Sequence, residues 1–207
     1  MSEFLAFFQL GFAHIASTSA LDHVLFLLVL AVVYRARDWR DALLVVSAFT
    51  VGHSVTLALA VTDTLRMNER VVEFLIPLTI VIAAAENLLV RERAGRTAGA
   101  PTRRYRPLLA GVFGLVHGAG FAGYLKSMFM ADIMLPLLGF NVGIEAGQIL
   151  VLAVITAVLV LVDMALLRLR TLRRSLTTVP VLHTRIVGLS LAIGLVAMVW
   201  TVERRPW

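Results

Sequence analysis

Ionisable side chains stand inside the long apolar stretches of this sequence, where such groups are uncommon. Four of the five histidines are placed this way, and three acids accompany them: His14, His23, His53 and His117, with Asp22, Glu86 and Glu145. An ionisable group at the centre of a bilayer costs about 2.5–3.5 kcal/mol on insertion scales, so such residues mark functional sites. Imidazole nitrogen and carboxylate oxygen together form a donor set for first-row transition metals. The pattern therefore predicts a buried metal site.

A simpler interpretation covers any one of these residues. A single histidine in a membrane helix is often a hydrogen-bonding partner of a neighbouring helix. Four histidines and three acids are harder to explain in this way. The sequence has no cysteine, which excludes disulfide frameworks and thiolate metal sites.

The composition predicts a membrane protein with a single domain over residues 1–207. Hydrophobic residues make up 59% of the 207 residues and charged residues only 15%, and the mean hydropathy is +0.89. A span needs about 20 predominantly apolar residues. Six stretches qualify and predict an all-α, polytopic transmembrane helical bundle: 4–34, 42–62, 72–90, 107–126, 136–167 and 182–201.

The basic residues predict how the spans are oriented. Fourteen of the 19 lysines and arginines fall in the stretches 35–41, 91–106 and 168–185, which six spans place on one side. Because basic loops stay in the cytoplasm, both termini are expected on the non-cytoplasmic side of a bacterial inner membrane. The net charge of +6 belongs to these connectors, so a nucleic-acid partner is not expected. The expected partners are the lipid bilayer and a metal ion, and the oligomeric state is left open.

The polar stretch 91–106, RERAGRTAGAPTRRYR, is expected to be a flexible cytoplasmic linker. It would divide a first three-helix half, 1–90, from a second, 107–207. The segments FTVGHS (49–54) and FGLVHG (113–118) echo one another weakly. Inverted repeats are common in transporters, but these two segments fall in the second and fourth spans, which do not correspond in a three-plus-three repeat.

The first span is expected to contain a break. His14 and His23 are nine residues apart, which places them on opposite faces of a continuous helix. Ser17, Thr18 and Ser19 supply polar groups for a break, and Ser19 with Asp22 has the spacing of a capping box. We therefore expect a short first helix, a break near 16–19 and a second helix from about residue 20. The alternative is one long tilted helix with His14 near the outer interface.

Two further spans carry polar residues on one face. Asn141, Glu145 and Gln148 are four and three residues apart and form one stripe. In the second span, Ser54 adjoins His53 and Thr50 on one face. Glycines surround His117 at positions 114, 118, 120 and 123. Such glycines allow close helix approach or a bend.

These motifs resemble the HupE/UreJ family of nickel permeases over nearly the whole chain. The resemblance rests on GFAHI, LDHVLFLLVL, FTVGHSVTLALA, AAENLL, FGLVHGAGFA and FNVGIEAGQILVL, which occur in the family's order. It implies a small membrane protein associated with nickel or cobalt uptake. In the family five residues separate the first histidine from Asp-His, whereas seven separate His14 from Asp22.

The resemblance implies a role for each matching residue. His14, Asp22 and His23 fall on the first-helix motif, His53 on the second-helix histidine and His117 on the HG motif. We expect a central metal site of Asp22, His23, His53 and His117, with Glu86 and Glu145 as further or transient ligands and His14 as an outer ligand. The supporting polar residues are Asn87, Asn141, Gln148 and Ser54.

The leading hypothesis is a metal permease rather than an enzyme. The resemblance favours nickel, and cobalt, zinc, copper or manganese would satisfy the same donors. The sequence contains no G-x-x-x-x-G-K-[ST] phosphate-binding loop, so the membrane potential or protons would drive transport. One alternative is an intramembrane zinc hydrolase that uses the same histidines and acids. Another is a membrane subunit in which the polar residues only join helices.

Overall fold

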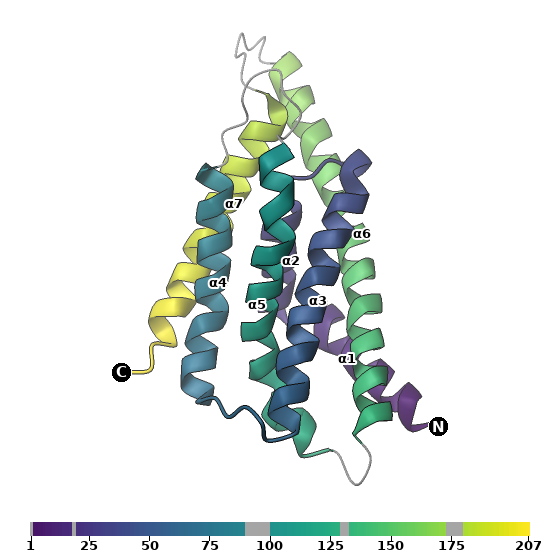
Figure 1. Ribbon diagram of the computed structural model, residues 1–207. Helices are drawn as coiled ribbons and strands as arrows, with labels where there is room; N and C mark the ends of the chain where they lie inside the picture. The colour runs from purple at the N-terminus through teal and green to yellow at the C-terminus, as the bar shows by residue number, and fades with distance from the viewer. Residues whose placement is uncertain (1, 18–19, 90–99, 129–132, 173–179) are drawn as a thin grey trace.

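The computed structural model describes residues 2–17, 20–89, 100–128, 133–172 and 180–207 (Figure 1). Within these ranges the regular structure is helical throughout, which confirms the all-α prediction. The elements are α1 (Glu3–Ala16), α2 (Leu21–Ala31), a 3-10 turn η1 (Ala36–Asp38), α3 (Trp39–Val61), α4 (Glu69–Leu89), α5 (Ala100–Lys126), α6 (Met134–Leu172) and α7 (Val181–Glu203).

The helices make up to six membrane spans, as predicted. In the part of the chain that is described, α3 to α7 are each long and apolar enough to cross a bilayer. The sixth span consists of α1 and α2 together, and the two helices are bent by 66° at the break between them. The fifth span, α6, is long for a different reason. It is one continuous helix of 39 residues, about 58 Å at 1.5 Å per residue, and extends beyond its neighbours in Figure 1.

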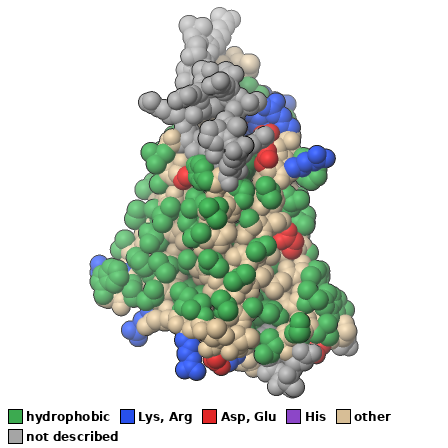
Figure 2. Space-filling model, viewed as in Figure 1, with side chains coloured by type: hydrophobic (Ala, Val, Ile, Leu, Met, Phe, Trp, Pro, Cys, Tyr) green, Lys and Arg blue, Asp and Glu red, His purple; other side chains and the backbone are tan. Residues whose placement is uncertain are grey.

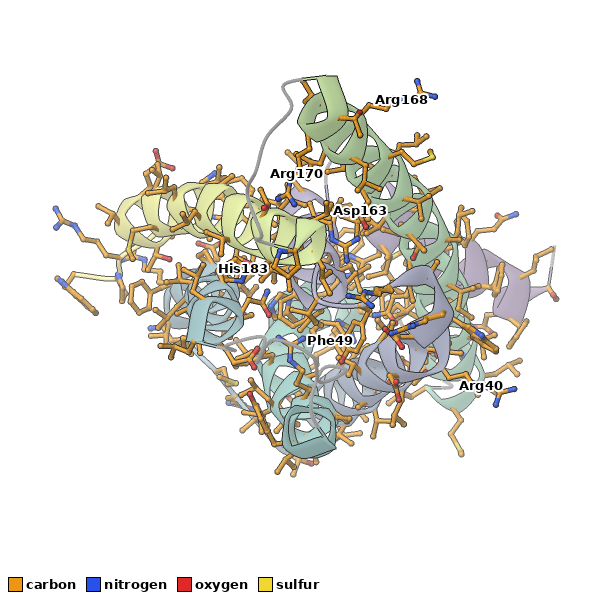
Figure 3. All side chains as sticks on the ribbon, turned by 90° about the horizontal axis from the view of Figure 1, so that it is seen from above. Arg40, Phe49, Asp163, Arg168, Arg170 and His183 are labelled. Carbon is orange, nitrogen blue, oxygen red and sulfur yellow. The ribbon has the colours of Figure 1, made fainter. Side chains whose placement is uncertain are left out.

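The bundle has two chemically different ends. At the upper end in Figure 1, α2 leads into α3, α4 and α6 end, and α5 and α7 begin. We call this the arginine-rich end, because Arg40, Arg168 and Arg170 lie there when the bundle is viewed from above (Figure 3). Both chain termini lie at the opposite end, called the terminal end (Figure 1). This alternation of helix directions is the one that the basic connectors predict. That the arginine-rich end faces the cytoplasm stays a prediction.

Glycines bring two pairs of parallel helices into backbone contact. A Cβ atom built at Gly114 or Gly118 of α5 would lie 2.1 Å from the carbonyl oxygen of Phe49 or 2.2 Å from that of His53 in α3. In the same way, a Cβ at Gly143 of α6 would lie 2.1 Å from the carbonyl oxygen of Phe8 in α1. Only a residue without a side chain permits this spacing. We refer to these units as the α3/α5 pair and the α1/α6 pair.

The flank of the bundle is apolar and the charges lie near its ends. Figure 2 shows hydrophobic side chains spread over the middle of the face in view, with lysine and arginine gathered toward the two ends. Large apolar side chains are exposed along the helices, among them Leu44 and Val51 of α3 and Val154 and Leu161 of α6. This is the surface expected of helices that face lipid.

The predicted linker is shorter than the sequence pattern indicates. The helix α5 begins at Ala100, so residues 100–106 belong to a helix, while residues 90–99 lie outside the described part. The polar composition of RERAGRTAGAPTRRYR is typical of a loop, so the sequence pattern did not predict these first helical turns.

Candidate metal centre

The break in the first span brings two histidines together. The helix α1 ends at Ala16, Ser17 is extended with ψ 156°, and α2 begins at Leu21. The rings of His14 and His23 are consequently 4.6 Å apart, measured between centroids. The predicted break is therefore confirmed. The predicted capping box involves Ser19, which lies outside the described residues; the N-cap of α2 is Ala20, and no described side chain caps it.

The α3/α5 pair contributes two more histidines. The His53 ring lies 6.1 Å from that of His14 and 6.4 Å from that of His23, and the His117 ring lies 5.3 Å from that of His23. His53 and His117 are at most 1% exposed. One ring nitrogen from each of His14, His23 and His53 can be chosen so that all three lie within 4.8 Å of one another. Four histidines from four helices thus meet in one cluster, which we call the histidine cluster.

Asp22 orients the ring of His23. Its Oδ1 atom accepts a hydrogen bond from the backbone N–H of His23 at 2.9 Å and lies 3.0 Å from Nδ1 of the same residue. A carboxylate oxygen is an acceptor, so Nδ1 carries the proton and Nε2 presents its lone pair. A carboxylate that holds a histidine in this way is the usual outer partner of a metal-binding imidazole. The geometry thus gives Asp22 a positioning role beside the cluster.

Thr79 of α4 fixes the ring of His117 in a similar way. The Thr79 hydroxyl donates its hydrogen to the carbonyl oxygen of Ile76 at 2.7 Å, and its oxygen lies 3.0 Å from Nε2 of His117. A hydroxyl has one hydrogen to donate. With that hydrogen used, His117 must donate from Nε2, and its Nδ1 carries the lone pair. Thr79 therefore selects the tautomer of a second cluster histidine.

The nitrogens that face the cluster lack protein partners. Among the described residues, the buried ring nitrogens without a hydrogen bond are Nε2 of His14, Nε2 of His23, both nitrogens of His53 and Nδ1 of His117. Buried polar atoms are nearly always hydrogen-bonded, because leaving one unpaired costs free energy. The unpaired atoms of His23 and His117 are the same ones that Asp22 and Thr79 leave with lone pairs. This arrangement is suited to a cation.

A cavity of about 480 Å³ adjoins the histidine cluster. His14, His23 and His117 line it, together with Ser17 and Ala20 from the two sides of the break. Phe121 also lines it, and its ring packs 4.1 Å from that of His14. The cavity thus reaches the side chains of three of the four cluster histidines.

Glu86 and Asn87 belong to a different group of polar residues. The Arg106 guanidinium forms an ion pair with Glu86 and also donates to Oδ1 of Asn87. The Tyr105 hydroxyl donates to Glu86 at 2.5 Å, and Asn87 donates to the carbonyl oxygen of Val29 at 2.7 Å. Glu86 is not in the group of donor atoms that meet around His14, His23 and His53. The structure thus pairs it with an arginine instead of bringing it to the histidines.

The polar stripe of α6 faces α3. Three hydroxyl groups of α3 donate to the three residues of the stripe: Ser54 to Asn141 at 2.9 Å, Ser47 to Glu145 at 2.5 Å and Thr50 to Gln148 at 2.5 Å. Glu145 is outside the group of donor atoms around the histidines. Together these bonds join the α1/α6 pair to the α3/α5 pair. The fifth histidine, His183, lies on α7 at the arginine-rich end (Figure 3).

Sequence reasoning missed Thr79 and the aromatic neighbours of the cluster. Thr79 lies seven residues before Glu86, two helical turns along the same face of α4, so a search for polar residues at helical spacing would have found it. The phenylalanines Phe26, Phe49 and Phe113 lack such a signal, because apolar residues are expected everywhere in a membrane span.

Comparison with known proteins identifies a family for this chain. No curated protein matches the chain at a significant level, and neither does any solved structure. The family model described as HupE / UreJ protein matches residues 1–204, which is almost the full length. Proteins of this family are known as metal transporter-like. The chain, with its broken first span and its buried histidines, belongs to the HupE/UreJ family.

Proposed function

We propose that this protein is a permease for a divalent transition metal, with nickel as the first choice and cobalt as the next. The observation that supports the proposal most is the histidine cluster with its unpaired nitrogens inside a membrane bundle. Those nitrogens suit nickel, cobalt, zinc and copper alike. The preference for nickel rests on the family resemblance. Because the ion is the cargo, the same site must bind it and release it.

The spacing of the donors supports binding of one ion. Metal–imidazole bonds are about 2.0–2.1 Å long, so two ligands on opposite sides of an ion are about 4.2 Å apart. The nitrogens of His14, His23 and His53 lie within 4.8 Å of one another, so a small rotation of the rings closes the site. Nδ1 of His117 would be the fourth donor. Asp22 and Thr79 would hold two of the rings in the binding tautomer.

The test compares metal binding and metal uptake in single-alanine variants. His23→Ala, His53→Ala and His117→Ala should each weaken nickel binding to the purified protein by more than about 100-fold, since changes to outer partners alone cost about 10–100-fold. They should also abolish nickel uptake into proteoliposomes. His183→Ala is the matched control, because His183 lies at the arginine-rich end outside the cluster, and it should behave like the parent. The site assignment is wrong if His23→Ala and His117→Ala bind nickel as the parent does.

The cluster and its cavity also support a second function. Three histidines with room for a water molecule beside them are the arrangement of a catalytic zinc site. A zinc hydrolase would turn over its substrate in detergent solution, whereas a permease produces accumulation only across a sealed membrane. Nickel that accumulates in sealed vesicles and is released by a pore-forming peptide supports the permease.

A further inference from the structure

The histidine cluster has an open side and a closed side. The open side is the cavity beside His14, His23 and His117, which contains Gly120 and Tyr124 in its lining. A second cavity, of about 340 Å³, is lined by the same Gly120 and Tyr124. It also contacts Asp63 and Lys126, which are exposed at the terminal end. The two cavities therefore adjoin at Gly120 and Tyr124, between the terminal end and the histidines.

Carboxylates line the outer of these two cavities. Asp63, Glu69 and Glu73 line the second cavity, against Arg66 and Lys126. Lys126 forms an ion pair with Asp63, and its hydrogen bond holds the pKa of that carboxyl below the ordinary value. Carboxylates near a cavity mouth raise the local concentration of cations.

Three phenylalanines close the other side. Phe26 follows His23 by three residues, and Phe49 and Phe113 precede His53 and His117 by four. Because α2 runs toward the arginine-rich end while α3 and α5 run away from it (Figure 1), all three rings lie one turn from the histidines on the arginine-rich side. Each ring is at most 4% exposed.

The three rings pack on one another and on a cluster histidine. The ring of Phe26 lies 4.8 Å from that of Phe49 and 5.8 Å from that of Phe113. The ring of His117 lies 4.9 Å from Phe26 and 5.1 Å from Phe49. Further toward the arginine-rich end, the buried core continues with Leu30, Val45 and Ala110. A cation cannot cross such a layer without losing its ligands.

We propose that the ion reaches the histidine cluster from the terminal end and that Phe26, Phe49 and Phe113 form the barrier that it must pass to leave at the arginine-rich end. The proposal rests on the proposed function, because it assigns the route of the same ion. It assigns a role to three residues whose side chains have no atom that could bind a metal. These phenylalanines should affect the passage of the ion through the protein and not its binding to the histidines.

Cysteine reporters test the barrier without requiring transport. The sequence has no cysteine, so each reporter variant carries a single thiol. Ser17→Cys places that thiol in the cavity beside the histidines. Val45→Cys places it one helical turn beyond Phe49, toward the arginine-rich end. Silver nitrate is applied to sealed vesicles whose terminal end faces outward, and the remaining thiols are counted after denaturation. In the parent background, silver should modify the cysteine at position 17 rapidly and the one at position 45 much more slowly.

Removing one barrier ring should open the path to the second reporter. With Phe49→Ala, the cysteine at position 45 should react about tenfold faster, which corresponds to a barrier lower by about 1.4 kcal/mol. Leu57→Ala is the matched control: Leu57 is equally buried in α3 and lies four residues from His53 on the opposite side. It should leave the rate unchanged. Phe113→Leu, which retains most of the apolar volume, serves as a second variant and should give a smaller increase.

The barrier is refuted if the cysteine at position 45 reacts as fast as the one at position 17 before any phenylalanine is changed. It is also refuted if Phe49→Ala and Phe113→Leu both leave the rate unchanged in vesicles that contain folded protein. The experiment can distinguish these outcomes from a failure of the proposed metal-transport function. A protein that binds no nickel would still show the one-sided silver reaction if the route and the barrier are as described.

Discussion

Replacing Gly118 by alanine tests the backbone contact that holds two cluster histidines in place. A Cβ atom at this position would lie 2.2 Å from the carbonyl oxygen of His53, 2.9 Å from its carbonyl carbon and 3.0 Å from its Cα, whereas ordinary contact begins at 3.4 Å. The nearest atoms belong to backbone, so no side chain can rotate away. The α3/α5 pair must therefore separate by about 1.2 Å, the difference between the two spacings.

This separation should affect both stability and binding. Overpacking of this kind costs about 1–3 kcal/mol, and for a chain of this size each kcal/mol lowers the melting temperature by about 2–4 °C. We therefore expect a fall of about 2–12 °C in the melting temperature of the purified protein. Metal sites require distances correct to about 0.2 Å. A shift several times larger between His53 and His117 should weaken nickel binding even where the protein remains folded.

Gly188→Ala in α7 is the matched control. Nothing lies within 4 Å of a Cβ atom at that position, and alanine is favoured over glycine in a helix by about 1 kcal/mol. This variant should melt at the same temperature as the parent or slightly higher, and it should bind nickel normally. If Gly118→Ala also melts within about 1 °C of the parent and binds nickel equally well, the contact between α3 and α5 is not as close as described.

Three other predictions concern outer partners, a buried ion pair and topology. Thr79→Val should weaken nickel binding by about 10–100-fold because the tautomer of the adjacent imidazole is no longer fixed, and Thr79→Ser should restore it; equal affinities in titration calorimetry would contradict this role. Arg106→Met should destabilise the protein by about 3–5 kcal/mol, because the partly buried Glu86 carboxylate loses its ion-pair partner and keeps only the Tyr105 hydroxyl. Adding Glu86→Gln should recover most of that loss in thermal melts, and failure to do so would mean that the ion pair is not the cause. Cysteines introduced at Ala98 and Pro206 should react with an impermeant maleimide from opposite faces of the membrane, Ala98→Cys from the cytoplasm; labelling of both from one face would overturn the six-span topology.

The sequence could predict the break in the first span because helix geometry leaves little choice. His14 and His23 lie on opposite faces of any continuous helix at their spacing, so only a break allows both to reach one site. The six spans follow equally directly from the length of the apolar runs. The cost of burying four histidines in those runs was a sufficient reason to expect them together, and the structure brings them together.

The partners of the acids could not be predicted in this way. Arg106 stands at the end of a stretch whose composition indicates a flexible linker. In the structure, however, α5 begins at Ala100, and Arg106 is only 5% exposed. Glu86 then has a cationic partner close by. Likewise, the hydroxyl groups that bind the α6 stripe come from α3, and nothing in either segment specifies which helices become neighbours.

The echo between FTVGHS and FGLVHG has an explanation that sequence alone did not give. The two segments are partners in the α3/α5 pair. Gly52 of the first segment lies against the carbonyl oxygen of Gly111, and Gly114 of the second lies against that of Phe49. The similarity therefore coincides with a shared contact, in which each helix places a glycine against the backbone of the other. Small residues at helical spacing predict close approach, but they do not identify the partner.

The pairing of α1 with α6 imposes an order on biosynthesis. At 14 residues, α1 is about 21 Å long, shorter than the hydrocarbon core of about 30 Å. Its close backbone partner is the fifth span, which leaves the ribosome more than a hundred residues later. While the chain is being synthesised, the face of α1 that contacts α6 therefore has no partner until the fifth span has been made. A chain interrupted before α6 would lack this partner, so its first helix would have no backbone contact of this kind to hold it in place.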